Sequence, residues 1–293
     1  MTARISSVMG NSQKLDGGAM FGNAPKALWS RWVSADQANR IDLACRAMLV
    51  ETSHEKWLFE TGIGAYMPPH LRDRYGVQES HHVLLASLKQ LDLEPEDIDV
   101  IVLSHLHFDH AGGLLTPWQN QEPPALLFPN ARILVGRKAW QRACEPHPRD
   151  RASFIPELMT LLERGNRTQL LAGDEQFDLG GVTLRFFESN GHTPGMMCSE
   201  LVGETGTLVF AADLIPGQPW VHVPITMGYD RFPEQLIDEK HELLTRLAAT
   251  HGRLFFTHDP HVASGCVTRD ESGRKFQVTN NLESLIRVGF TDL

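Results

Sequence analysis

The segment Ser104–Gly113, SHLHFDHAGG, places three histidines and one aspartate within six consecutive positions. It directly follows an apolar run, residues 98–103, that is typical of a buried strand. A loop at the end of a strand is a common place for a site, because the sheet fixes its position while its side chains stay available. Imidazole and carboxylate groups are ligands for Zn²⁺, with Fe and Mn as alternatives. The segment therefore predicts a metal site at a strand end.

The spacing divides these ligands into two sets. His105 and His107, two positions apart, lie on the same side of an extended chain, whereas Asp109 and His110 lie beyond a turn. One loop cannot complete two metal positions, so we expect further ligands at other strand ends. Three residues directly follow strand-like runs or turns and fit this expectation: His192, Asp213 and His258.

The distribution of strand and helix patterns predicts a mixed α/β layered architecture. Short apolar runs bounded by Gly, Asp or Pro indicate strands at 44–51, 56–61, 100–104, 132–136, 182–188, 196–202, 207–212 and 253–257. Helical periodicity is clearest over Pro233–Thr250 and is also present over Ser80–Leu91. Pro-rich pieces such as residues 67–69 indicate surface loops rather than linkers, so we expect one domain over residues 1–293.

The chain contains, in this order, the motif HxHxDH, the motif GHTPG, an apolar strand ending in Asp and another ending in His. In this combination of motifs it resembles the metallo-β-lactamase superfamily. The resemblance implies an αββα four-layer sandwich, two mixed β-sheets flanked by helices, with metals at one edge of the sheets. It implies two Zn²⁺ per chain, with water activated between them. The implied ligands are His105, His107 and His192 for one ion, Asp109, His110 and His258 for the other, and Asp213 as the bridge.

Within the superfamily, the length and the segment Phe210–Pro216 resemble the branch of lactonases and organophosphate hydrolases. This resemblance implies a hydrolase of a small-molecule ester, foremost a lactone of the N-acyl homoserine type, with Asp109 and Asp213 in the catalytic centre. A phosphotriesterase-like or arylesterase-like hydrolase is the alternative. Lactonases of this branch carry a tyrosine shortly after the bridging aspartate, where this chain has Pro216 and Gly217. We expect Tyr229 to supply the phenol instead.

Other members of the superfamily fit less well. A glyoxalase-II-like thioesterase needs a basic patch for glutathione carboxylates, and no Lys/Arg cluster is visible. An iron-dependent persulfide dioxygenase keeps one metal and dispenses with part of the second ligand set, whereas Asp109 and His110 are both present. A non-catalytic metal-binding protein would tolerate loss of Asp213. The metal content of the purified protein distinguishes these alternatives.

Composition limits the partners. With 27 basic and 36 acidic residues the net charge is −9, which repels a phosphate backbone, so nucleic acid is not an expected partner. No apolar run approaches the ~20 residues of a membrane helix, and the N-terminal segment lacks a secretory signal pattern. The four cysteines form no CxxC pair. We therefore expect a cytoplasmic protein with reduced thiols and no membrane partner.

Side chains around the site are also predicted. Ser104 and Thr257 precede proposed ligands and are expected to orient imidazoles by hydrogen bonds. Apolar and aromatic loop residues suit the wall of a substrate pocket. The candidates are Met20, Phe21, Tyr66, Met67, Trp118, Trp220 and His222. Aromatic loop residues near Trp220 could also form a homodimer interface.

Overall fold

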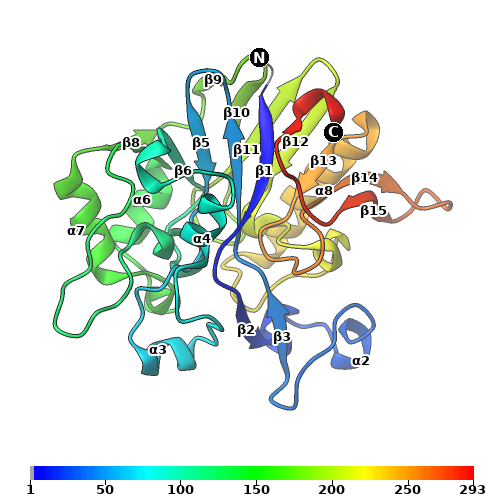
Figure 1. The fold of residues 1–293 in the computed structure, drawn as a ribbon. Helices are drawn as coiled ribbons and strands as arrows, with labels where there is room; N and C mark the ends of the chain where they lie inside the picture. Colours follow the sequence, from blue (N-terminus) through cyan, green and yellow to red (C-terminus); the bar gives the residue numbers. More distant parts are fainter. Residues whose placement is uncertain (1–2) are drawn as a thin grey trace.

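A computed structural model describes residues 3–293 of the chain. Two seven-stranded sheets face one another, and helices cover their outer sides (Figure 1). Across the first sheet the strands are β16 (Val288–Gly289), β1 (Arg4–Met9), β4 (Arg46–Glu51), β5 (Lys56–Phe59), β6 (Val100–Leu103), β7 (Arg132–Gly136) and β8 (Thr168–Leu171). Across the second they are β15 (Phe276–Leu282), β14 (Ser264–Arg269), β13 (Arg253–Phe255), β12 (Gly206–Phe210), β11 (Met196–Gly203), β10 (Thr183–Ser189) and β9 (Gln176–Asp178).

Both sheets are mixed. In the first sheet β5, β6, β7 and β8 run parallel, and β1 and β4 are antiparallel to their neighbours. In the second sheet only the β12–β13 pair is parallel. The four-layer α/β sandwich predicted from the sequence is therefore confirmed.

The helices complete the outer layers. They are α1 (Gly17–Met20), α2 (Lys26–Trp29), α3 (Pro69–Arg74), α4 (Val83–Lys89), α5 (Phe108–Ala111), α6 (Arg137–Cys144), α7 (Pro156–Gly165) and α8 (Pro233–Thr250). Single turns of 3-10 helix are η1 (Pro95–Asp97), η2 (Gly112–Leu114), η3 (Arg151–Ser153), η4 (Ala212–Leu214), η5 (Gln218–Val221) and η6 (Phe290–Asp292). Helices α4, α6 and α7 pack on the first sheet, and α8 packs on the second.

Strand β6 shows why the run before the metal-binding segment is apolar throughout. Successive side chains of a strand point to opposite faces. Val100 and Val102 join the core between the two sheets, while Ile101 and Leu103 join the core beneath the helices. All four residues are buried, as expected for a parallel strand covered on both sides.

The strands that precede the proposed ligands end at one edge of the sandwich. β5 and β6 are parallel, and β10, β12 and β13 share one direction because β10 and β12 are both antiparallel to β11. The two sheets are joined at this edge by backbone hydrogen bonds, from Met197 N to Ser104 O at 2.8 Å and from Ala44 N to His258 O at 3.1 Å. Side chains that leave these strand ends therefore meet.

The predicted elements agree with the structure in the core and differ at the margins. The predicted bounds of α8 are confirmed, and the other predicted helix is shorter, beginning at Val83. The strand predicted over 56–61 stops at Phe59, because Glu60 takes a φ of 68° and leaves the extended conformation. The proline-rich piece at 67–69 is not loop throughout, because Pro69 begins α3, where its missing N–H is no disadvantage.

A small sheet outside the sandwich was not predicted. It consists of β2 (Gln13–Asp16) and β3 (Arg40–Leu43), which lie below the main sheets in Figure 1. Its two strands are antiparallel, with Gln13 opposite Leu43. This sheet contributes side chains to the candidate site described below.

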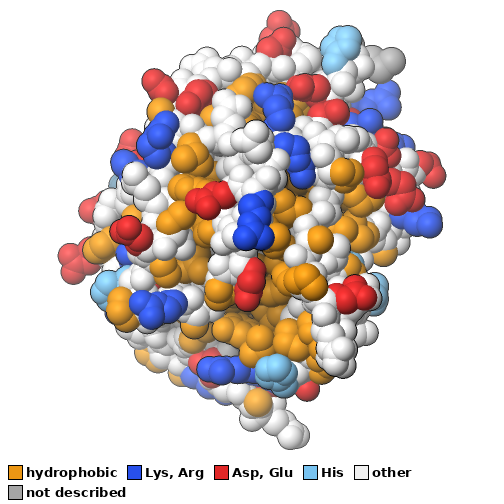
Figure 2. Space-filling model, turned by 90° about the vertical axis from the view of Figure 1, so that its left-hand side faces the viewer, with side chains coloured by type: hydrophobic (Ala, Val, Ile, Leu, Met, Phe, Trp, Pro, Cys, Tyr) orange, Lys and Arg blue, Asp and Glu red, His pale blue; other side chains and the backbone are white. Residues whose placement is uncertain are grey.

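The helix layer of the first sheet leaves part of its apolar surface accessible. On the face that carries α3, α6 and α7, hydrophobic side chains gather in the middle and lower part, with charged side chains around them (Figure 2). Leu71, Trp140 and Met159 are half-buried members of this layer. The homodimer stays a prediction, as does the single-domain organisation.

Two further sequence expectations concern thiols and membranes. All four cysteines are free; Cys45 and Cys198 are buried, whereas Cys144 is exposed. Among the helices of residues 3–293, none combines the length and apolar character needed to cross a bilayer.

Candidate metal centre

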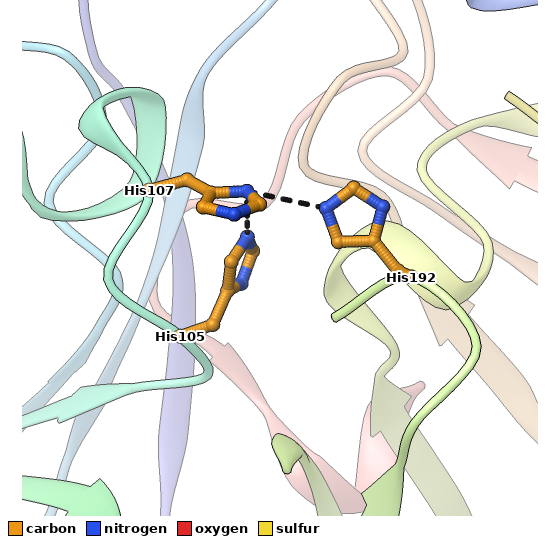
Figure 3. A group of neighbouring side chains, drawn as sticks. All are labelled: His105, His107 and His192. Carbon is orange, nitrogen blue, oxygen red and sulfur yellow. Dashed lines mark hydrogen bonds between the residues drawn. The ribbon is translucent and has the colours of Figure 1, made fainter. Parts of the chain in front are cut away.

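Three imidazoles from both sheets converge at the common edge. His105 and His107 follow β6, and His192 follows β10. His107 Nδ1 lies 3.0 Å from His105 Nε2 and 3.3 Å from His192 Nε2 (Figure 3). A tetrahedral zinc with Zn–N bonds of ~2.0–2.1 Å places its nitrogen ligands roughly 3.3 Å apart. The spacing of the three nitrogens therefore suits a metal ion.

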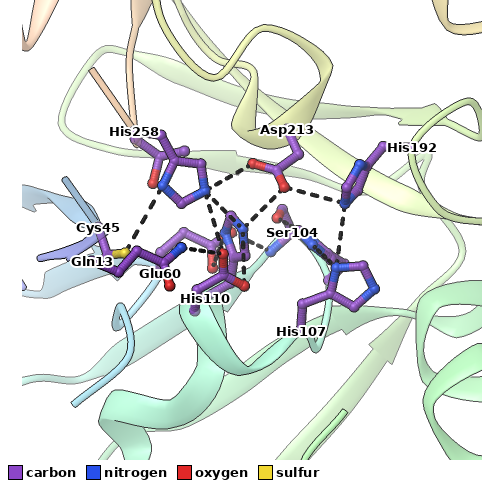
Figure 4. A network of polar contacts seen from close by, with 12 residues as sticks. Gln13, Cys45, Glu60, Ser104, His107, His110, His192, Asp213 and His258 are labelled. Atoms are coloured by element: carbon purple, nitrogen blue, oxygen red, sulfur yellow. Dashed lines mark hydrogen bonds and ion pairs between the residues drawn. The ribbon is translucent and has the colours of Figure 1, made fainter. Parts of the chain in front are cut away.

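A second group lies beside the first. His110 Nε2 and His258 Nε2 are 3.3 Å apart (Figure 4). Asp109 Oδ1 is 3.8 Å from His110 Nε2, and Asp109 Oδ2 is 3.7 Å from His258 Nε2. Asp109 and His110 sit on the one-turn helix α5, whereas His258 follows β13. This group also has the donor types of a zinc site.

Asp213 lies between the two groups and contacts both. Its Oδ2 is 3.2 Å from His192 Nε2 and 3.4 Å from His110 Nε2, and its Oδ1 is 3.1 Å from His258 Nε2. The residue follows β12 in the turn η4. The structure thus brings all seven predicted ligand side chains together, with Asp213 in the position expected of a bridge.

The electrostatics of the cluster favour bound cations. Burial lowers the pKa of His105 and His107 well below the usual value, and the neighbouring imidazoles lower it further, so both rings are neutral. Burial alone would raise the pKa of Asp213, but His110, His192 and His258 outweigh it and hold that pKa well below its usual range. Neutral imidazoles and an ionised carboxylate are the forms that bind metal.

The pKa values of His110 and His258 shift in the opposite direction. Burial lowers the pKa of each ring, but the neighbouring acidic groups, Asp213 foremost, together outweigh burial and raise both pKa values well above the usual value. Protons on these rings then balance the buried carboxylates, and a metal ion would take their place. The donor set therefore fits the zinc ions that the superfamily resemblance implies.

Hydrogen bonds fix the outer nitrogens of three rings. Ser104 Oγ is 2.8 Å from His105 Nδ1, and the Ala44 carbonyl is 2.6 Å from His258 Nδ1. Asp230 Oδ1 is 2.9 Å from His192 Nδ1. Such partners set the tautomer and the orientation of a metal-binding imidazole. The prediction for Ser104 is confirmed, whereas that for Thr257 is wrong, because its hydroxyl donates to the Arg46 carbonyl instead.

Three buried polar residues of the site were missed by the sequence analysis. Besides Asp230, they are Glu60 and Gln13. Glu60 accepts a hydrogen bond from Ser104 N at 2.9 Å and lies 3.5 Å from His110 Nδ1. Gln13 contacts Asp109. Glu60 carried a usable signal, since it stands at the end of an apolar run as the ligands do, but the other two did not.

A cavity of about 210 Å³ opens onto the cluster. Its wall beyond the metal-site residues is largely apolar and includes Leu15, Met20, Leu43, Tyr75, Phe108, Met227 and Tyr229, with Arg149 as a cationic member. Tyr229 lines the cavity, and the residue is 42% exposed. Burial, and then the charge of Asp109, raise the pKa of its phenol, which therefore keeps its proton.

Of the other predicted wall residues, only Met20 lines this cavity. Phe21 and Trp220 stack behind it with ring centroids 4.8 Å apart, and the Trp220 indole donates to the Met20 carbonyl. Trp118 is exposed. Trp220 and His222 line a different cavity, whose wall also includes residues of β3 and β15. Phe21 and Trp220 therefore support Met20 rather than touch the pocket.

Comparison with known proteins agrees with this geometry. Residues 40–258 match the family model described as the metallo-beta-lactamase superfamily. The chain belongs to the metallo-β-lactamase superfamily. All seven predicted ligands fall within the matched residues. Two of the three missed residues, Glu60 and Asp230, also fall within the match, whereas Gln13 does not.

Relatives within the superfamily are distant in sequence and similar in fold. N-acyl homoserine lactonase AttM of Azorhizobium caulinodans is 32% identical over 114 residues, which are 38% of each chain. This alignment thus spans well under two thirds of the length of the curated relative. A probable metal-dependent hydrolase from Staphylococcus aureus has a TM-score of 0.81 and 26% identity, covering 96% of this chain and 98% of that one. AidC, described as a dizinc quorum-quenching lactonase, has a TM-score of 0.73 and 21% identity, covering 94% of each chain.

Proposed function

We propose that this protein is a dinuclear zinc hydrolase that opens a lactone. The observation that carries the proposal is the meeting of seven metal-binding side chains from both sheets at the base of one largely apolar cavity. One ion would be held by His105, His107 and His192, the other by Asp109, His110 and His258, with Asp213 between them. When bound, the two ions supply Lewis-acid chemistry, activating water and polarising a carbonyl oxygen.

The residues of the chain contribute orientation and a proton. Asp213 contacts histidines of both groups and so fixes their separation. Tyr229 lines the cavity with a protonated phenol, which suits it to donate a hydrogen bond to the oxygen that leaves when the ester opens. This assignment replaces the tyrosine that resembling lactonases carry nearer to the bridging aspartate.

The substrate class is inferred from the cavity wall. Leu15, Met20 and Met227 present apolar surface, which suits an uncharged ester with an acyl chain. The similarity to curated N-acyl homoserine lactonases supports a lactone as that ester. An aryl phosphotriester has a comparable apolar body and is the alternative to be tested. A cytoplasmic location also remains part of the proposal.

The test combines metal content with turnover. Zinc-loaded protein is expected to contain two Zn per chain and to hydrolyse N-acyl homoserine lactones faster than thiolactones or aryl phosphotriesters. Asp213→Ala should lose metal and lower kcat/KM roughly a hundredfold to ten-thousandfold, as expected when Lewis-acid stabilisation is removed. Turnover of phosphotriesters alone would replace the substrate class. Full metal content and full rate in the Asp213→Ala protein would refute the site itself.

Tyr229 has a separate test. Tyr229→Phe removes only the hydroxyl, so zinc content should stay at the wild-type level while kcat falls about a hundredfold, the lower range for loss of a positioned proton donor. An unchanged kcat would show that the phenol does not reach the leaving oxygen and would leave the metal assignment intact.

A further inference from the structure

The second metal position has a hydrogen-bonding partner outside the residues that match the superfamily model. The family match begins at residue 40, and Gln13 precedes it on the small sheet. The Gln13 side chain lines the cavity and donates from Nε2 to Asp109 Oδ2 at 3.3 Å (Figure 4). The two residues are 96 positions apart in the chain. This contact therefore depends on how the N-terminal segment is placed against the sandwich.

The backbone around Gln13 is held on both sides. Gln13 pairs with Leu43 in β3, and on the other side it forms an isolated bridge with Val77. Lys14 N donates to the Gly76 carbonyl at 2.9 Å. Gly76 has a φ of 68°, and a Cβ there would lie 2.2 Å from the Lys14 carbonyl oxygen, so this close approach requires glycine. The strand thus presents the Gln13 side chain from a fixed position.

The chemistry of the contact sets its direction. Gln13 is only 1% exposed, so its amide cannot exchange freely between the protein and water. The amide nitrogen faces Asp109 Oδ2, because the amide oxygen has no proton to donate to an accepting carboxylate oxygen. Gln13 Oε1 has no hydrogen-bond partner within residues 3–293, so the bond to Asp109 is the one that fixes this side chain.

Like three of the ligand histidines, Asp109 has a hydrogen-bonding partner outside the ligand set. His105, His192 and His258 are oriented by Ser104, Asp230 and Ala44, respectively. For the Asp109 carboxylate, the bond from Gln13 is the only hydrogen bond from outside the ligand set among the residues that the structure describes. Without it the carboxylate can rotate into the cavity, away from His110 and His258.

We infer that Gln13 is a positioning residue for Asp109 and thereby completes the second metal position. The inference rests on the proposed dinuclear zinc site. Its consequence is selective, since the group formed by His105, His107 and His192 makes no contact with Gln13. Partners that orient metal ligands typically change metal affinity about tenfold to a hundredfold.

The experiment measures zinc binding directly. Metal-free wild-type and Gln13→Met proteins are titrated with zinc alone against a competing chelator. Methionine keeps the length of the side chain and tolerates burial, but it removes the N–H donor. We expect the wild type to bind two zinc ions, and the variant to bind the first with unchanged affinity and the second about tenfold to a hundredfold more weakly.

Two further variants guard against a folding defect. Lys14→Met changes the next residue of the same strand, whose side chain pairs with Asp42 at 2.9 Å, and should bind both ions as the wild type does. Gln13→Asn keeps the amide but shortens its reach, so it should share the defect of Gln13→Met while its thermal unfolding stays near wild type.

Wild-type affinity for the second zinc in both Gln13 variants would overturn the inference while leaving the proposed function standing. A wild-type protein that binds fewer than two zinc ions would instead count against the proposed function. Loss of both ions in the Gln13 variants, with Lys14→Met normal, would likewise overturn the selective role given to Gln13.

Discussion

At the scale of single residues, the orientation of three of the five ligand imidazoles depends on a hydrogen-bonding partner outside the ligand set. Asp230 accepts from His192 Nδ1 and also from Met227 N, so its carboxylate links a ligand to the loop that carries Tyr229. It is 2% exposed, which keeps water from replacing either bond. Asp230 therefore serves the first metal position as Gln13 serves the second.

This arrangement gives a prediction for the first position. Asp230→Asn removes the charge that holds the His192 ring, so the affinity of the first zinc should fall about tenfold to a hundredfold. Zinc titration against a competing chelator measures the change. Asp238→Asn, at an exposed position of α8, is the matched control and should bind zinc as the wild type does. Wild-type affinity in Asp230→Asn would contradict the assignment.

His82 gives a prediction about pH. The ring is buried before α4, with Nε2 3.1 Å from the Gly113 carbonyl, and burial lowers its pKa from 6.5 to about 4. Because the folded-state pKa lies below the unfolded value, the stabilising contribution is complete above about pH 6.5 and is lost as the pH falls toward 4. The loss should approach about 3 kcal/mol in the free energy of unfolding.

Denaturant unfolding between pH 7 and pH 4 tests this expectation. His82→Gln keeps a side-chain donor but cannot take up a proton, so its stability should depend less steeply on pH than that of the wild type. His81→Gln, the exposed neighbour, should retain the wild-type dependence. Parallel curves for all three proteins would show that His82 does not contribute.

At the scale of elements, the loop that carries four of the ligands is held by glycine contacts. Gly113 N donates to the Gly62 carbonyl at 2.8 Å, and a Cβ at Gly113 would lie 2.0 Å from the Thr61 carbonyl oxygen. Neither backbone can give way easily, because Thr61 N is itself bonded to the His110 carbonyl. The loop after β5 thus fixes the position of α5 relative to the sheet.

Gly113→Ala should therefore disturb both stability and the site. Overpacking of this kind costs typically 1–3 kcal/mol, and we expect the upper part of that range together with a lower zinc content. Thermal unfolding and metal analysis check the two effects. Gly206→Ala, at the first residue of β12, where a Cβ would meet nothing within 4 Å, is the control and should be nearly neutral.

The elements also show which parts of the fold sequence patterns can predict. Strands β6, β12 and β13 each end in apolar residues and are followed within three residues by a ligand, so both their location and the ligand position were predicted. β1 contains two serines, and β15 is mostly half-buried or exposed, so neither has a clear apolar pattern. Gln13 and Asp230 could not be predicted as site residues, because their partners lie far away in the sequence and only the tertiary fold brings them close.

At the scale of the whole molecule, the proposed metal ions would connect the two sheets. His105 and Asp109 follow β6 of the first sheet, whereas His192, Asp213 and His258 follow strands of the second. A ligand that binds only the folded state adds stability, about 3 kcal/mol at a hundred times its Kd. Chelation should therefore lower the Tm of the wild-type protein clearly.

Measuring the Tm of Asp213→Ala with and without chelator separates metal binding from other effects of the chelator. Because this variant is expected to lack metal already, its Tm should be insensitive to chelation. A wild-type Tm that does not respond to chelator, in protein shown to have lost its zinc, would mean that the ions do not couple the sheets.

The order of the ligands along the chain has a consequence for biogenesis. His258 is the last of the seven, and it follows β13, which is added beside β12 only after α8 has been made. A growing polypeptide therefore gains its first three imidazole donors long before its final one. Hydrolytic competence should appear late in translation, once nearly every layer of the sandwich has emerged, so that a prematurely truncated product is inert rather than partly active.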